Sequence, residues 1–175
     1  MSDTTLRLRL SDDAATLWLG AALARAMPEP PAAAGVVYLR GELGAGKTTC
    51  VRSLLHALGV TGIVRSPTYT LVETHAAPGL QCVHIDLYRL RGASDLEDLG
   101  LRDYLSQGHL LLIEWPERGA TALPPSDIDV SLAYREADQD SGRDAQILAR
   151  SPWGNAWLAN LRKNPSLTSY VANLT

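Results

Sequence analysis

The sequence has little of several features that mark particular classes of protein. Only two of its 175 residues are cysteines, Cys50 and Cys82, and neither a Cys-x-x-Cys nor a Cys/His ligand spacing surrounds them, so a disulfide framework or a zinc site is not expected. No run of consecutive apolar residues is longer than four, whereas a transmembrane helix needs about twenty. The N-terminus lacks the basic head and apolar stretch of a secretory signal. These absences predict a cytoplasmic protein with no membrane association, in which both cysteines pack as small apolar residues.

The chain also has no excess of positive charge. Sixteen basic and nineteen acidic residues give a net charge of -3, which excludes an overall electrostatic footprint for nucleic acid, so any contact with RNA needs a local patch or a partner protein. Only Lys47 and Lys163 are lysines, so the position of Lys47 is informative. With 46% hydrophobic and 20% charged residues, the composition is typical of one soluble globular domain.

The pattern of the first half predicts alternating strands and helices. Apolar and polar residues alternate in 5–10, which predicts a half-buried strand, and Ser11 or Asp12 can cap a helix that runs to about residue 27. A short strand at 35–40 leads into a glycine loop, and a helix from Lys47 ends at Gly59. Residues 68–74 and 80–87 then predict an antiparallel hairpin.

The second half continues the α/β pattern with extra antiparallel strands. Residues 94–106 predict one or two short helices broken at Gly100, and 109–115 predict a strand buried on both faces. Strands at 128–132 and 145–149 form a second hairpin around an acidic turn at 137–142, and 155–163 predict a last helix. We therefore expect one domain over residues 1–163 and a loosely held tail over 164–175.

The strongest motif is a complete G-x-x-x-x-G-K-[ST] loop between the strand at 35–40 and the following helix. Its residues are Gly41, Glu42, Leu43, Gly44, Ala45, Gly46, Lys47 and Thr48. Glycines let backbone N–H groups converge on phosphate oxygens, and the helix N-terminus favours the same anion. Lys47 supplies a compact charge to the β- and γ-phosphates, and the Thr48 hydroxyl is a ligand for Mg²⁺. The motif in this context predicts a nucleotide-binding protein with a P-loop NTPase-like sheet flanked by helices.

Two carboxylates are candidates to complete the magnesium site, because each follows a buried strand. Glu114 ends the run 110–113 and Asp86 follows 83–85, and at least one of them is expected to serve the metal. Thr68 lies between the motif helix and the next strand, where a hydroxyl can complete the metal shell, although an ordinary turn explains it as well. Tyr69 is expected to be half-buried packing and His84 a structural strand histidine. Trp115 could belong to the core or to an interface.

Five segments together resemble one protein family. GELGAGKTT, SPTYTLVE, HIDLYRL, LGLRDYL and LLIEWPE occur in this order within residues 10–150 and resemble the TsaE (YjeE) family, the small ATPase of bacterial tRNA threonylcarbamoyladenosine synthesis. The resemblance implies a P-loop ATPase that acts with two other proteins, TsaB and TsaD, and reaches tRNA mainly through them. The modification lies beside the anticodon of ANN-decoding tRNAs.

The resemblance also assigns roles to individual residues. Lys47 and the 41–46 backbone, together with Thr49, would hold the phosphates of ATP, and Thr48 and Glu114 would hold Mg²⁺. Asp86 would lie near the γ-phosphate and the attacking water, and Thr68 matches a switch-like threonine. Ser11, in the segment 11–16, would lie near the adenine.

Other functions remain open alongside this one. The chain has neither the N-K-x-D nor the D-x-x-G motif of Ras-like GTPases. A small-molecule P-loop kinase is less favoured, because residues 121–150 read as strands rather than as an arginine-rich lid. A nucleotide-gated binding module, in which hydrolysis is incidental, is the third alternative. The pattern leaves self-association undetermined.

Overall fold

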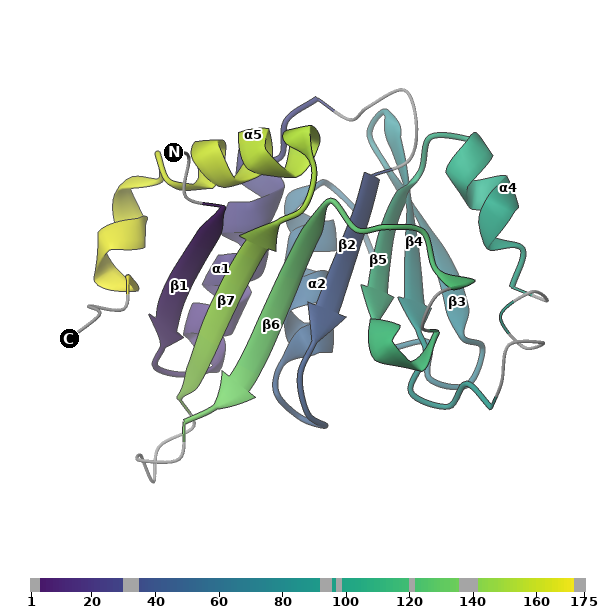
Figure 1. Ribbon diagram of the computed structural model, residues 1–175, viewed down its shortest axis with the longest axis horizontal. Coiled ribbons are helices and arrows are strands. Elements are labelled where there is room, and N and C mark those ends of the chain that lie inside the picture. The colour runs from purple at the N-terminus through teal and green to yellow at the C-terminus, as the bar shows by residue number, and fades with distance from the viewer. Residues whose placement is uncertain are drawn as a thin grey trace.

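A seven-stranded mixed sheet forms the centre of the molecule in the computed structural model, which describes residues 4–29, 35–91, 96, 99–119, 122–135 and 142–171. The strands lie in the order β1-β7-β6-β2-β5-β4-β3 (Figure 1). Their bounds are β1 Thr5–Leu10, β2 Gly35–Arg40, β3 Val72–Ala77, β4 Leu80–Asp86, β5 Leu110–Glu114, β6 Ile128–Tyr134 and β7 Arg143–Ala149. The four adjacent strands β6, β2, β5 and β4 are parallel, whereas β7, β1 and β3 add antiparallel pairs at the two sides. The predicted α/β class with extra antiparallel strands is confirmed.

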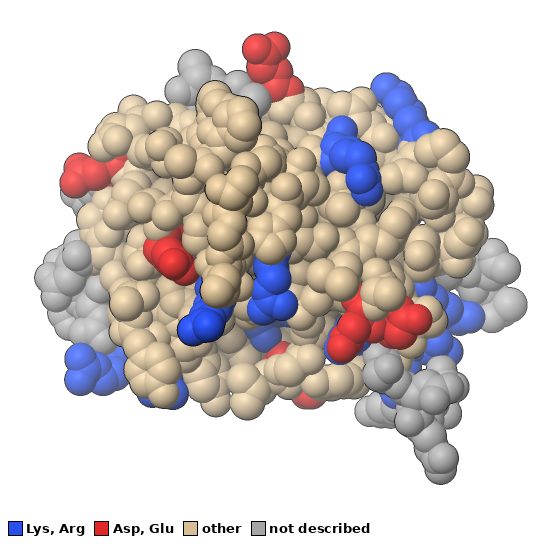
Figure 2. Space-filling model, turned by 180° about the vertical axis from the view of Figure 1, so that it is seen from behind, with Lys and Arg blue, Asp and Glu red and all other residues tan. Residues whose placement is uncertain are grey.

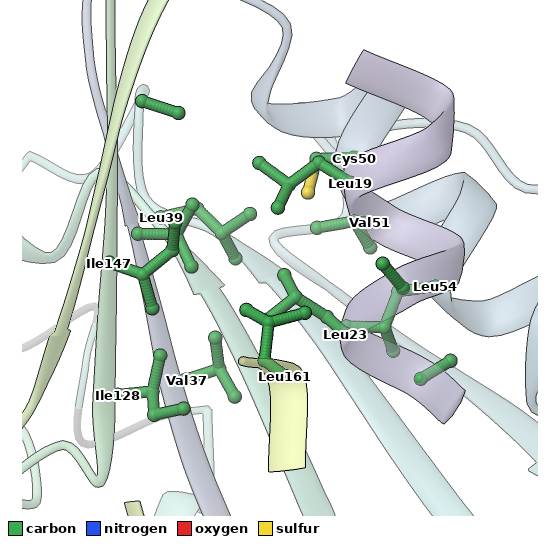
Figure 3. Close-up of a cluster of buried hydrophobic side chains, with 14 of the residues drawn as sticks. Leu19, Leu23, Val37, Leu39, Cys50, Val51, Leu54, Ile128, Ile147 and Leu161 are labelled. Atoms are coloured by element: carbon green, nitrogen blue, oxygen red, sulfur yellow. The ribbon is translucent and has the colours of Figure 1, made fainter. Parts of the chain in front are cut away.

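Helices cover the two faces of the sheet unequally. The α-helices with described bounds are α1 Asp13–Ala26, α2 Lys47–Ala57, α4 Leu101–Ser106 and α5 Pro152–Leu161. Two short 3-10 helices are η1 Pro116–Arg118, after β5, and η3 Pro165–Ser169, after α5. Side chains from α1, α2 and α5 pack with one face of the sheet in the larger apolar core (Figure 3). A smaller core on the other face covers β2, β5 and β4. The central strands β2 and β5 are therefore buried on both faces, as their continuous apolar runs predict.

The helix boundaries follow local capping signals. Asp12, one of the two predicted caps, accepts a hydrogen bond from the Ala15 N–H at 2.7 Å and begins α1. Helix α5 begins three residues earlier than predicted, because Ser151 caps it and Pro152 occupies its first turn. Gly20 lets α1 approach α2 closely, since a Cβ atom there would lie 2.3 Å from the Cys50 carbonyl oxygen.

The hairpin β3–β4 starts later than predicted. The expected strand at 68–74 is instead a turn up to residue 70, and Leu71 has a positive φ of 64° before β3 begins at Val72. The Thr68 hydroxyl bonds Asp86, and the Leu71 N–H donates to the Pro67 carbonyl oxygen at 2.7 Å. A local turn and a hydrogen bond to the end of β4 therefore replace the strand pairing that the composition of this segment favours.

The segment after α5 is packed rather than loosely held, so this prediction is wrong for residues 165–171. Leu167 is buried, the Tyr170 ring stacks on Trp18 at 4.0 Å between centroids, and the Arg9 N–H donates to the Tyr170 carbonyl oxygen. Val171 forms a bridge with Leu8 at the free side of β1. Residues 172–175, the acidic turn at 137–141 and most of 92–98 lie outside the described residues.

Both cysteines are buried and unlinked, as predicted. Burial raises the pKa of each thiol to about 12, and for Cys50 the negative charge of Glu114 adds to the effect. Within the described part of the chain, none of the helices combines the length and the apolar character needed to cross a bilayer.

Candidate active site

The glycine loop joins the end of β2 to α2 at the edge of the sheet where the parallel strands end (Figure 1). Gly41 and Gly46 have positive φ values of 135° and 104°, which residues with a Cβ atom rarely adopt. A Cβ at Gly41 would also lie 2.2 Å from the Leu132 carbonyl oxygen, so β6 leaves room only for glycine. Gly46 is the N-cap of α2, so the helix N-terminus opens toward the loop.

Lys47 lies within the curve of this loop and is only 4% exposed. Its ammonium group donates hydrogen bonds to the carbonyl oxygens of Gly41 at 2.7 Å and Glu42 at 2.8 Å, and it lies 3.9 Å from the centroid of the Trp115 ring. Burial lowers the pKa of Lys47, and the charge of Glu114 opposes this shift. The loop thus places one buried positive charge at the C-terminal edge of the sheet.

Two carboxylates lie beside this charge because of the strand register. Asp86 of β4 is directly opposite Glu114 of β5, and both are almost fully buried, at 3% and 2% exposed. The Thr48 hydroxyl lies 3.0 and 3.1 Å from the two carboxylate oxygens of Glu114 and donates to them. The hydrogen bond between the Thr48 hydroxyl and the Glu114 carboxylate therefore joins the first turn of α2 to the end of β5.

Asp86 has a separate set of donors. Its Oδ2 accepts hydrogen bonds from the hydroxyls of Ser66 and Thr68, the latter at 3.1 Å, and its Oδ1 accepts one from the Tyr88 N–H at 2.9 Å. The segment before β3 is thus fastened to the end of β4. Three donors hold the carboxylate in one orientation without any contribution from Lys47 or Thr48.

These groups surround a cavity of about 410 Å³. Of the residues that the sequence singled out, nine line it: Leu43, Gly44, Gly46, Lys47, Thr48, Thr49, Thr68, Asp86 and Glu114. Gly41 and Glu42 contribute only the carbonyl oxygens that bind Lys47, and Ala45 is packed in the core. Ser11 is exposed and is not among the lining residues.

Four lining residues were not assigned to the site from the sequence: Ser66, Tyr88, Arg89 and Trp115. Trp115 has a positive φ of 58°, and its ring lies 5.0 Å from that of Tyr88. The available signal was adjacency, since Trp115 follows Glu114 directly and Tyr88 comes two residues after Asp86. Tyr69 was expected to be half-buried, but it is 84% exposed, with the Arg89 guanidinium 4.2 Å from its ring centroid.

The oxygen atoms of this site fit Mg²⁺. In the described ranges no group of three or more His, Cys, Asp or Glu side chains is arranged to hold a metal ion. Magnesium in nucleotide sites uses few protein ligands, because phosphate oxygens and waters supply the others. The Thr48 hydroxyl and the Glu114 carboxylate meet that small requirement at 3.0 Å from one another.

A glycine loop between a buried strand and a helix, a buried lysine and two strand-end carboxylates define a P-loop protein. The family model described as "Threonylcarbamoyl adenosine biosynthesis protein TsaE" matches residues 10–145. The chain belongs to this family.

Proteins named tRNA threonylcarbamoyladenosine biosynthesis protein TsaE are similar to it. The one from Haemophilus influenzae is 44% identical over 119 residues, which are 68% of this chain and 73% of the relative. The one from Streptomyces coelicolor is 44% identical over 128 residues, which are 71% and 84% of the two chains. The crystal structure of Bacillus subtilis YdiB matches with a TM-score of 0.74 at 25% identity and covers 91% of this chain and 95% of that one. The similarity thus extends over sequence and fold.

Proposed function

We propose that this protein is a magnesium-dependent ATPase subunit that binds and hydrolyses ATP. The observation that carries the proposal is the contact between Thr48 and Glu114 beside the buried ammonium group of Lys47. Lys47 and the loop N–H groups hold the phosphates, and Thr48 and Glu114 hold Mg²⁺. The metal, when bound, neutralises charge on the β- and γ-phosphate oxygens.

In this proposal, the Asp86 carboxylate positions the water that attacks the γ-phosphate. Its carboxylate lines the cavity next to Glu114, and Ser66, Thr68 and the Tyr88 N–H fix its orientation. A water held there forms the new bond to the γ-phosphorus as the bond to the β-γ bridging oxygen breaks, which gives ADP and phosphate. Thr68 connects this step to the segment before β3, so that occupancy of the site can change the position of that segment.

The hydrolysis serves tRNA modification in a complex with TsaB and TsaD. The relatives named above support the pathway, and the charge distribution supports an indirect approach to tRNA. The net charge is -3, and acidic and basic side chains are interspersed on the face shown in Figure 2. We place this activity in the cytoplasm, where threonylcarbamoyladenosine forms beside the anticodon of ANN-decoding tRNAs.

The test is ATP hydrolysis by the purified chain, alone and with TsaB and TsaD, in the presence of Mg²⁺. We expect low activity alone, a sharp rise with the partners, and loss of the activity in Lys47→Ala. Lys163→Ala is the matched control, because Lys163 is the one other lysine and lies exposed in the turn that follows α5.

Two results would contradict the proposal in different ways. Transfer of label from γ-labelled ATP to a metabolite would indicate a small-molecule kinase. A Glu114→Gln variant that binds ATP, cannot hydrolyse it and still supports many rounds of tRNA modification would indicate a nucleotide-gated binding module.

A further inference from the structure

His84 lies behind the carboxylate that we assign to the metal. It belongs to β4 and is 0% exposed, and its Nε2 atom lies 2.8 Å from Oε1 of Glu114. The same carboxylate accepts the Thr48 hydroxyl, which lies 3.0 Å from Oε1 and 3.1 Å from Oε2. Thr48 lines the cavity, whereas His84 is not among its lining residues. Glu114 therefore accepts hydrogen bonds from one group that lines the cavity and from one that does not.

The sheet register makes this contact possible. His84 and Asp86 are two residues apart on β4 and so point to the same face, and Asp86 is directly opposite Glu114. All three side chains lie on the face that α2 covers, as the neighbouring Cys82 and Leu112 do in the larger core. A strand histidine at this position can reach the carboxylate diagonally, and a residue one position earlier or later would point to the other face.

The hydrogen-bonding partners define which nitrogen carries the proton. A carboxylate only accepts hydrogen bonds, so the Nε2 atom that faces Glu114 must donate. The other ring nitrogen, Nδ1, is buried and has no hydrogen-bond partner within the part of the chain that the structure describes. A proton on Nδ1 would be a buried donor without an acceptor, which is costly. The geometry therefore places a hydrogen on Nε2, toward Glu114.

We propose that His84 is a positioning residue that fixes the orientation of Glu114 for Mg²⁺, an inference that rests on the function proposed above. It does not touch the nucleotide or the metal. It supplies a donor to the carboxylate that is independent of Thr48. The remaining acceptor positions of the Glu114 carboxylate and the Thr48 oxygen therefore stay available to the ion. Donors of this kind behind a metal ligand commonly change metal affinity by about 10- to 100-fold.

The competing explanation is that His84 only fills space in the strand, as the sequence alone suggested. The two explanations differ for a pair of substitutions. His84→Leu keeps an apolar side chain of similar size but removes the donor, whereas His84→Gln keeps an N–H donor that can reach the same carboxylate oxygen. A space-filling role would tolerate leucine at least as well as glutamine at a buried position.

The experiment is calorimetric titration of each purified full-length variant with a non-hydrolysable ATP analogue, with and without Mg²⁺. We expect His84→Leu to lose about tenfold or more of the magnesium-dependent gain in affinity while its magnesium-free affinity stays within about threefold of the parent. His84→Gln is expected to recover most of the gain. Full gain in His84→Leu, or equal losses in two folded variants, would overturn the proposal.

A second measurement needs neither nucleotide nor metal. In ¹⁵N NMR of the imidazole groups, the His84 signal, identified by its absence in His84→Gln, should show hydrogen on Nε2 and should shift in Glu114→Gln. Hydrogen on Nδ1, or no shift in Glu114→Gln, would overturn the proposal even if His84→Leu does not fold. A parent chain whose affinity for the analogue does not depend on Mg²⁺ would instead overturn the proposed function, and that result requires no variant.

Discussion

The ammonium nitrogen of Lys47 lies 3.9 Å from the centroid of the Trp115 ring, so one positive charge rests on an aromatic face at the edge of the candidate active site. Trp115 takes this position because its backbone has a positive φ of 58° and its backbone N–H donates to the Leu39 carbonyl oxygen at 3.2 Å. A nucleotide that draws Lys47 toward its phosphates changes the electrostatic surroundings of this indole.

Trp115 should therefore report nucleotide binding. We expect the tryptophan emission of the protein to change when a nucleotide is added, and the change to disappear in Trp115→Phe while calorimetry still detects binding. Trp18→Phe is the matched control, because Trp18 stacks on Tyr170 and does not line the cavity. An unaltered response in Trp115→Phe would show that another tryptophan gives the signal and would contradict the prediction.

Glu114 and Asp86 should fail in different ways when each is replaced by its amide. Glu114→Gln removes a charge that Thr48 and the metal share, so magnesium-dependent affinity should fall by about 10- to 100-fold, since a hydrogen bond to a charged group contributes about 1.5–3 kcal/mol. Asp86→Asn should leave affinity within about threefold and slow hydrolysis by about 10²- to 10⁴-fold. Equilibrium titrations and single-turnover rates measure the two effects, and the reverse pattern would exchange the assigned roles.

The two buried thiols should make stability fall in alkaline solution. The pKa of each thiol rises from 9.0 to about 12 on folding, so above pH 9 the folded chain binds more protons than the unfolded one. The free energy of unfolding therefore falls with pH, by up to about 1.4 kcal/mol per pH unit for each thiol. The double variant Cys50→Ala/Cys82→Ala should show a shallower slope between pH 9 and 11 in urea unfolding. Equal slopes would mean that the thiols ionise alike in both states.

The packed segment after α5 should contribute to the stability of the whole domain. Truncation after Asn164 removes the buried Leu167 and the stack of Tyr170 on Trp18. From about 1.5–3 kcal/mol for the leucine and about 0.5–1.5 kcal/mol for the ring pair, we expect a loss of about 2–4 kcal/mol in chemical unfolding. A truncation that ends at Val171 keeps both contacts and serves as the control. Equal stability of the two truncated chains would show that the segment adds nothing.

The elements that the sequence predicted best are those with a strong local signal. The runs at 35–40 and 110–113 are apolar throughout and are the fully buried strands β2 and β5, and Asp12 is the helix cap that its residue type favours. The start of β3 and the segment 165–171 were mispredicted because their positions depend on distant partners. Asp86 holds Thr68 out of the strand, and Trp18 and β1 hold Tyr170.

The glycine loop, its lysine and threonine, and the two carboxylates that follow buried strands could all be identified from the sequence, because each depends on residue types within a few positions of one another. How these groups combine depends on strand pairing and helix packing. Parallel pairing of β4 with β5 places Asp86 opposite Glu114 and brings His84 within 2.8 Å of that carboxylate, and α2 brings Thr48 to the same carboxylate. Such contacts join residues 30 and 66 positions apart, and strand register and helix packing, rather than local propensity, select them.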